Sequence, residues 1–156
     1  MNYQLDEIDK KILDFLVENT RMPFTEIAKQ MDVSAGTIHV RVKKMEDAGI
    51  ILGSSLNIDY GKLDYHFTAF IGILLTKSNR TQEVLKELST LPNVIEASVI
   101  SGKYNIFCKV RAKNTDDAKR IIYQIDDIQD VMRTESMISM EEFLSDKNRL
   151  INAISI

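Results

Sequence analysis

One stretch of the sequence has the charge and the polar side chains of a nucleic-acid contact. Residues Val33 to Met45 include no acidic residue and bring three cations close together, Arg41, Lys43 and Lys44. A helix in the major groove reaches base edges with its N-terminal residues and phosphates with flanking cations. We predict groove contacts by Ser34, Thr37, His39 and Arg41, and phosphate contacts by Lys43 and Lys44. Taken alone, the segment could equally well be an ordinary solvated face of a helix.

A second stretch could bind a small ligand through its backbone. Gly102 lies in a predicted two-residue link between two strands, where a tight turn can require a positive φ. The missing side chain also lets a ligand approach the main chain, and N–H groups in such a turn can bind a carboxylate. Considered by itself, Gly102 is more simply a hairpin glycine.

The residue types that usually perform catalysis or bind metals are scattered along the chain. The two histidines, His39 and His66, belong to different predicted domains. The single cysteine, Cys108, alternates with Ile106 and Val110 on a predicted strand, which places it in the core. These residues form no zinc signature, and the sequence has no glycine-rich phosphate loop. We therefore predict a protein that is not an enzyme and that holds no metal or cofactor.

The composition is that of a soluble globular protein. The 156 residues suffice for one domain of ordinary size or two small ones, with 44% hydrophobic and 28% charged residues. The net charge of −3 lacks the basic excess typical of nucleic-acid binders, but a local basic patch can exist on an acidic protein. The longest uncharged apolar stretch, Ala69 to Leu75, is too short to span a bilayer, and the acidic N-terminus differs from a secretory signal. We expect a cytoplasmic protein with no membrane partner and, because it has one cysteine, no internal disulfide.

Three helices are predicted in the first 50 residues. Apolar residues recur at helical spacing from Leu5 to Leu16, and Asp6 can cap the start of that helix. A second helix begins near Pro23. Ser34 is a good N-cap for a third helix, which ends at Gly49. The brief link between the last two helices is typical of a helix-turn-helix, although any small helical bundle could show the same pattern.

The rest of the chain predicts a second domain. Residues 50–60 change from helical to alternating spacing, which indicates an extended linker, and Gly61 and Lys62 mark the expected boundary between a domain 1–62 and a domain 63–156. Strands are predicted at about residues 66–76, 94–101, 104–112 and 131–142, with one helix after the first and one after the third. Each helix is followed by a short break and a valine, so the two halves look like a repeated βαβ unit.

This order predicts an α+β protein with a ferredoxin-like βαββαβ domain. Its helices would cover one face of an antiparallel sheet. The strand at residues 66–76 is apolar on both faces, through Ile71 and Ile73 on one and Phe70 and Leu74 on the other. The uncovered face is therefore expected to meet another subunit.

Taken together, four segments of the chain resemble the Lrp/AsnC family of transcription regulators. The match runs over nearly the whole chain, and the third-helix string is similar to the asparagine-responsive branch. The segments are Leu5–Leu13, Val33–Val42, Ala48–Ile51 and Ser101–Asn105. Two residues depart from the usual pattern, since Ala35 stands where relatives often have proline and Asn105 where many have aspartate.

The resemblance implies an N-terminal helix-turn-helix domain that binds double-stranded DNA and a C-terminal domain that senses a small amino acid. It also implies dimers formed through the sheets, and octamers. The implied effector site comprises Gly102, Tyr104, Asn105, Thr134, Glu135 and Ser136. Glu135 could accept from the ammonium of the amino acid, although without the resemblance an exposed strand carboxylate is just as plausible. Asn105 offers both a donor and an acceptor, which suits a carboxamide. Asparagine is therefore the first candidate effector, followed by leucine or methionine.

The leading hypothesis is a sequence-specific DNA-binding transcriptional regulator whose assembly responds to a small amino acid. One alternative is an amino-acid-binding metabolic enzyme with a ferredoxin-like domain, against which the lack of an acid, base or nucleophile cluster argues. Another is an amino-acid-binding assembly protein without DNA activity, which a mobility-shift assay would distinguish.

Overall fold

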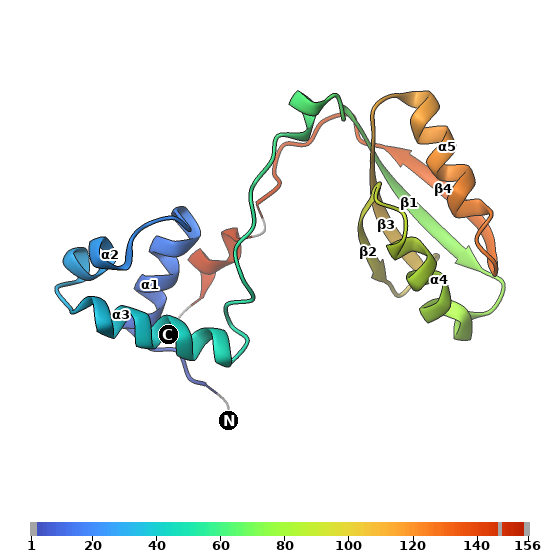
Figure 1. The fold of residues 1–156 in the computed structure, drawn as a ribbon. Helices are drawn as coiled ribbons and strands as arrows, with labels where there is room; N and C mark the ends of the chain where they lie inside the picture. Colours follow the sequence, from blue (N-terminus) through green and yellow to red (C-terminus); the bar gives the residue numbers. More distant parts are fainter. Residues whose placement is uncertain (1–2, 147, 155–156) are drawn as a thin grey trace. The chain divides into compact units, whose positions relative to one another are not determined.

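The computed structural model describes residues 3–146 and 148–154, and it divides into two compact units (Figure 1). A helical unit comprises Met1–Asn57 and Leu144–Ile156, and a sheet unit comprises Ile58–Phe143. The predicted domains, 1–62 and 63–156, differ from this division in two places, at residues 58–62 and at residues 144–156. Residues 1, 2, 147, 155 and 156 of those domains lie outside the described residues.

Specific contacts account for both differences. The short 3₁₀ helix η1, Tyr60–Leu63, belongs with the sheet because the Tyr60 ring lies against the guanidinium of Arg111, 5.9 Å from the ring centroid. A second 3₁₀ helix, η3, Arg149–Ala153, belongs with the helices because Ile151 packs against their hydrophobic core. The last segment of the chain therefore completes the N-terminal unit, which hydrophobic periodicity along the sequence could not indicate.

The helical unit contains three helices, α1 (Glu7–Glu18), α2 (Phe24–Met31) and α3 (Ala35–Asp47). The predicted caps are confirmed. The Asp6 carboxylate accepts from the N–H groups of Ile8 and Asp9, and the Asp9 carboxylate accepts in return from the Asp6 N–H. Ser34 Oγ accepts from the Thr37 N–H at the start of α3.

A left-handed residue makes the sharp link between α2 and α3. Asp32 has φ 53° and ψ 45°, and one further residue leads to the Ser34 cap of α3. The two helices then pack with α1 around a core that has no solvent exposure at its centre. Its fully buried members are Ile12, Ile27, Ile38 and Met45.

The sheet unit has the predicted order of elements. It contains β1 (Phe67–Leu75), α4 (Thr81–Ser89), β2 (Val94–Val99), β3 (Ile106–Ala112), α5 (Thr115–Asp126) and β4 (Val131–Ile138). The strands are ordered β2-β3-β1-β4, and every neighbouring pair is antiparallel. A short 3₁₀ helix, η2 (Ser78–Arg80), leads into α4. The predicted α+β class and the βαββαβ order are confirmed.

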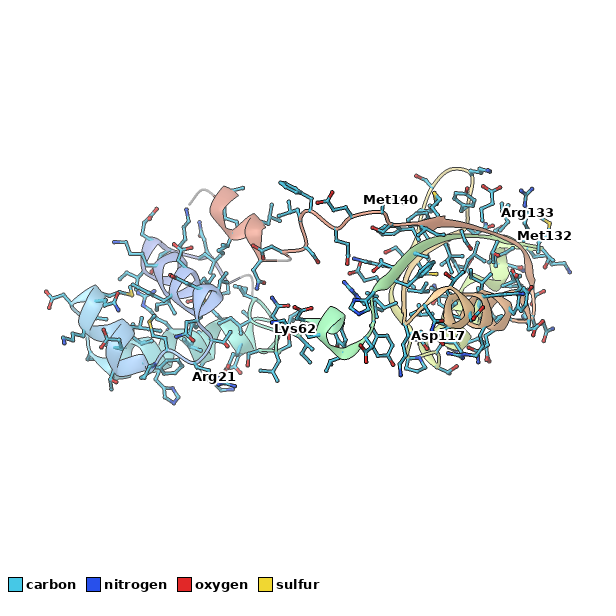
Figure 2. The ribbon with its side chains drawn as sticks, turned by 90° about the horizontal axis from the view of Figure 1, so that it is seen from above. Arg21, Lys62, Asp117, Met132, Arg133 and Met140 are labelled. Atoms are coloured by element: carbon cyan, nitrogen blue, oxygen red, sulfur yellow. The ribbon has the colours of Figure 1, made fainter. Side chains whose placement is uncertain are left out.

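Both helices pack on one face of the sheet (Figure 1). Figure 2 shows these two layers, with Arg133 on the sheet side and Asp117 on the helix side. The buried core between them includes Cys108, as predicted, and burial raises the pKa of its thiol to about 12. No helix among the described residues is long and apolar enough to cross a membrane.

No helix among the described residues covers the opposite face of the sheet. Phe70 of β1 stacks on Phe107 of β3 there, with ring centroids 6.0 Å apart. The same face also carries charge, because Glu142 forms ion pairs with Lys109 and Arg111. The predicted apolar face is therefore a mixed one, with aromatic side chains beside a charged cluster.

Two strand ends differ from the prediction. The link between β2 and β3 covers residues 100–105 rather than two residues, because the Asn105 N–H donates to the Ile73 carbonyl of β1 before β3 begins. The last strand ends at Ile138 instead of continuing to Glu142. The ion pairs of Glu142 hold residues 139–142 across the sheet face, so this segment does not follow the strand ladder.

Candidate DNA-binding surface and effector site

The first turn of α3 is fixed by two hydroxyl groups that were predicted to contact DNA. Ser34 Oγ accepts from the Thr37 N–H at 3.1 Å, and it lies 2.9 Å from Thr37 Oγ1. Both hydroxyl groups remain at the surface. They therefore set the start of the helix and can still bond a groove or a phosphate through their remaining lone pairs.

Arg41 has a structural partner in the same unit. Its Nη1 lies 2.7 Å from Asp6 Oδ2 and 2.9 Å from Asp9 Oδ1, and Asp9 is only 1% exposed. Tyr3 donates its hydroxyl to the other oxygen of Asp9. Bonds from the Asp9 N–H and then from Arg41 hold the pKa of Asp6 below its ordinary value, while Asp6 and then Asp9 raise the pKa of Arg41. The predicted groove contact thus ties α3 to the start of α1.

The other predicted DNA-binding side chains are exposed. Lys43 forms an ion pair with Asp47 one turn later at 2.8 Å, and that bond is the main reason that the pKa of Lys43 is raised. His39 meets the ring of Phe24 edge to face, with centroids 6.0 Å apart. Lys44 has no ion pair with the described residues, so its charge is available to a phosphate. Val40, an exposed apolar residue between His39 and Lys43, was not predicted from the sequence.

The predicted effector loop has the expected backbone. Gly102 has φ 120°, which confirms the predicted positive φ, and no atom lies within 4 Å of the position that a Cβ would occupy. Nearby, the ring of Tyr104 covers Gly72 of β1 so closely that a Cβ there would lie 2.6 Å from a ring carbon. Gly72 therefore admits the tyrosine to the sheet face.

Glu135 is the centre of a hydrogen-bonded group on that face. Tyr104 donates its hydroxyl to Glu135 Oε2 at 2.5 Å, and Lys103 Nζ lies 2.8 and 2.6 Å from the two carboxylate oxygens. Arg133 adds a contact of 3.1 Å to Glu135 Oε1. The bond from Lys103 and then that from Tyr104 lower the pKa of Glu135, and Glu135 in turn raises the pKa of Lys103. The carboxylate predicted to accept an ammonium group already holds one.

The side chain of Asn105 forms a hydrogen bond to the sheet. Its Oδ1 accepts from the Leu75 N–H at 2.9 Å, so the carboxamide joins the loop to the end of β1. Its acceptor is thereby occupied, and its two amide N–H donors have no partner among the described residues.

The structure does not bring all the predicted effector residues together. Because successive residues of a strand point to opposite faces, Thr134 and Ser136 lie on the other side of β4 from Glu135. Thr134 instead donates its hydroxyl to Asp126 of α5 at 2.7 Å, and Ser136 stands opposite the buried Ile71. Tyr104 and Glu135 meet, together with Lys103 and Arg133, which the sequence analysis did not single out. The position of Lys103 next to Gly102 in the sequence was the one signal that could have suggested a role for Lys103.

Metal-binding clusters are absent from the part of the chain that the structure describes. No group of three or more His, Cys, Asp and Glu side chains there could hold a metal ion.

Two family models match this chain. Residues 5–46 match the AsnC-type helix-turn-helix domain, and residues 68–148 match the Lrp/AsnC ligand binding domain. The first match spans α1, α2 and nearly all of α3, and the second begins in β1 and continues beyond β4.

Known proteins resemble the chain over nearly its full length. The regulatory protein AsnC of Haemophilus influenzae is 39% identical over 140 residues, 89% of this chain and 93% of that protein. AsnC of Escherichia coli K12 is 39% identical over 141 residues, covering 90% and 93%. A solved structure of E. coli AsnC matches with a TM-score of 0.87 and 37% identity over 92% of this chain and 97% of that one.

A more distant structure shares the fold. A transcriptional regulator of Neisseria meningitidis, solved in complex with L-Met, matches with a TM-score of 0.87 at 20% identity over 93% of this chain and 96% of that one. The relatives at 39% identity are named regulatory proteins, which leaves the enzyme alternative without support. With its helix-turn-helix joined to a ligand-binding sheet domain, this chain is a DNA-binding transcriptional regulator that belongs to the Lrp/AsnC family.

Proposed function

We propose that this regulator binds a small amino acid in its sheet unit and that the bound amino acid favours one assembly of the protein over another. The observation that carries the proposal is the Glu135 carboxylate, which holds the primary ammonium of Lys103 beside the Gly102 loop. The α-ammonium of an amino acid is the same kind of group as Lys103 Nζ, so one can replace the other. Backbone N–H groups at Gly102 would bind the α-carboxylate.

Asparagine is the first effector that we propose, followed by leucine or methionine. Asn105 has its acceptor bound by the Leu75 N–H, which leaves amide donors for an acceptor on the effector side chain. Asparagine carries such an oxygen and leucine does not. The L-Met complex of the Neisseria regulator keeps methionine among the candidates.

The proposed DNA contacts lie on α3. Lys44 and Lys43 would bind phosphates, whereas Ser34, Thr37 and His39 would contact the groove. The exposure of all of them except the half-buried Thr37 supports these roles. Arg41 remains a proposed contact, but its bonds to Asp6 and Asp9 support a role in positioning α3.

The assembly that we propose is a homo-oligomer, from a dimer to an octamer. The stacked Phe70 and Phe107 lie on a sheet face that no helix of the described part of the chain covers, which supports a contact with a second copy. Because the partner of a transcriptional regulator is the genome, we place the protein in the cytoplasm.

Thermal-shift screening against the twenty amino acids tests the effector. A ligand that binds only the folded protein adds about 2.7 kcal/mol at 100 times its Kd, which is readily measured. Calorimetry on two variants then tests the site: Glu135→Gln should abolish binding of asparagine, and Lys103→Met should strengthen it several-fold by removing the competing ammonium. Unchanged asparagine affinity in Glu135→Gln would refute the site, and a protein stabilised by none of the twenty would refute amino-acid sensing.

A further inference from the structure

Helix α3 presents one large apolar side chain directly away from its core. Val40 is 54% exposed, although Ile38, two residues earlier, is 0% exposed. Two residues correspond to about 200° around a helix, so Val40 lies opposite the side chains that hold α3 in the unit. Val40 is not among the residues that pack against the core of the helical unit.

The residues of α3 near Val40 line one open hollow of about 560 Å³. They are Gly36, Thr37, Arg41 and Lys44, and Tyr3, Gln4, Asp6 and Asp9 from the start of the chain complete the lining. Gly36 adds no side chain one turn before Val40, so the helix surface can come close to a groove floor. Lys44 places a cation one turn after it. Arg41 lies in the same hollow, where its guanidinium pairs with Asp6 and Asp9 and offsets part of their charge beside Val40.

The chemistry of Val40 matches a single group in the major groove. An isopropyl group has neither donor nor acceptor, and of the four base pairs only those containing thymine present an apolar group in that groove, the C5-methyl. We propose that Val40 is a specificity-determining residue that packs against a thymine C5-methyl in the operator. The inference rests on the helix-turn-helix function and is independent of the effector.

Replacement of thymine by deoxyuridine tests this contact because it removes only the methyl group. High-affinity duplexes would be selected from a random-sequence library with the unmodified protein, and each thymine would then be replaced in turn. We expect one position in each half-site at which deoxyuridine weakens binding about fourfold, the ratio equivalent to about 0.8 kcal/mol for one buried methyl group. In the Val40→Ala variant, the same replacement of thymine by deoxyuridine should change the affinity by less than about 1.5-fold.

Two control variants separate this contact from general effects. Val99→Ala removes a valine of similar exposure, 57%, from the sheet unit, and it should keep the fourfold ratio. Lys44→Ala should weaken binding to both duplexes and also keep the ratio. Because each ratio compares two duplexes with the same protein preparation, a partly unfolded variant does not change it. The proposal is wrong if Val40→Ala retains the full deoxyuridine penalty, or if no thymine of the selected site shows one.

Discussion

The charge of Asp9 is buried, and the structure neutralises it with a residue from another helix. Its carboxylate bonds Arg41, the Tyr3 hydroxyl and the Asp6 N–H, and it is almost inaccessible to water. Arg41 stands 32 residues away in a cluster of cations, where local sequence suggests only a contact with DNA. A pairing of this kind depends on how α1 and α3 pack, so it could not be predicted from the spacing of charges along the chain.

Arg41→Ala should destabilise the helical unit by about 3 kcal/mol. Removal of one partner leaves a buried carboxylate uncompensated, and the value lies at the low end of the usual range because Tyr3 and Asp6 still bond Asp9. Lys43→Ala is the matched control: the side chains of Lys43 and Asp47 are 60% and 64% exposed, so loss of their solvent-screened ion pair should change the stability far less than Arg41→Ala does. Urea unfolding measures both. Equal losses in the two variants would contradict a structural role for Arg41.

A second residue-scale prediction concerns pH. The bond from Lys109, followed by the charge of Arg111, holds the pKa of Glu142 below its ordinary value of 4.5. A carboxylate with a depressed pKa in the folded state stabilises the fold above its unfolded pKa, and this contribution is lost as the pH falls through the folded value. We expect the melting temperature of the protein to fall more steeply below about pH 4.5 than that of Glu142→Gln. Parallel melting curves from pH 7 to pH 3 would show that Glu142 contributes nothing.

At the scale of elements, local chemistry was enough to place the helices and strands. Asp6 and Ser34 are capping residues whose partners lie two or three residues away, so the sequence alone predicts the starts of α1 and α3. The loop before β3 was predicted too short because its end is set by Asn105, whose bonds reach β1 about 30 residues earlier. Bonds between distant elements leave no local signal.

The candidate sites show the same difference between what residue type suggests and what the fold decides. The family resemblance singled out Glu135 together with the neighbouring Thr134 and Ser136, although the alternation of a strand places those two on its other face. Val40 was missed for a different reason. A valine suggests burial by its type, and only the position of Ile38 on the helix shows that Val40 must face outward.

Lys44 is expected to bind phosphate through its charge alone. Each phosphate contact contributes about 0.9 to the slope of log affinity against log salt concentration, so Lys44→Ala should flatten the slope of a dimer by about two units. Arg41→Ala should weaken DNA binding without this change, because its charge is already paired. Fluorescence anisotropy at four salt concentrations separates the two effects. A slope that Lys44→Ala leaves unchanged would place Lys44 outside the interface.

Gly102→Val should abolish the response to the amino acid while DNA binding persists. The cost is in the backbone: φ of 120° is strained for valine, whereas a Cβ at Gly102 would meet no atom within 4 Å. The loop must therefore change its path and move its N–H groups, and the separate helical unit is unaffected. Calorimetry and a mobility-shift assay measure the two activities. Normal binding of the amino acid by Gly102→Val would place the effector site elsewhere.

At the scale of the whole molecule, the proposed response to an effector is a coupling between two equilibria. If the amino acid binds one assembly more tightly than another by some factor, it shifts the assembly equilibrium by that factor for each site. Assembly must then change the affinity for the amino acid equally, because the coupling is reciprocal. This requirement makes the mechanism testable without an operator or a promoter.

Phe70→Asp should uncouple the two equilibria. Its side chain stacks on Phe107 on the uncovered sheet face, so a charge placed there would cost several kcal/mol in a dry contact between copies and should yield smaller species. Sedimentation would show asparagine shifting the assembly of the unmodified protein but not that of Phe70→Asp. Calorimetry should then give the variant an asparagine affinity that does not depend on protein concentration. An unmodified protein that is monomeric with and without asparagine would refute the coupling, and a fully assembled Phe70→Asp would show that copies meet through another surface.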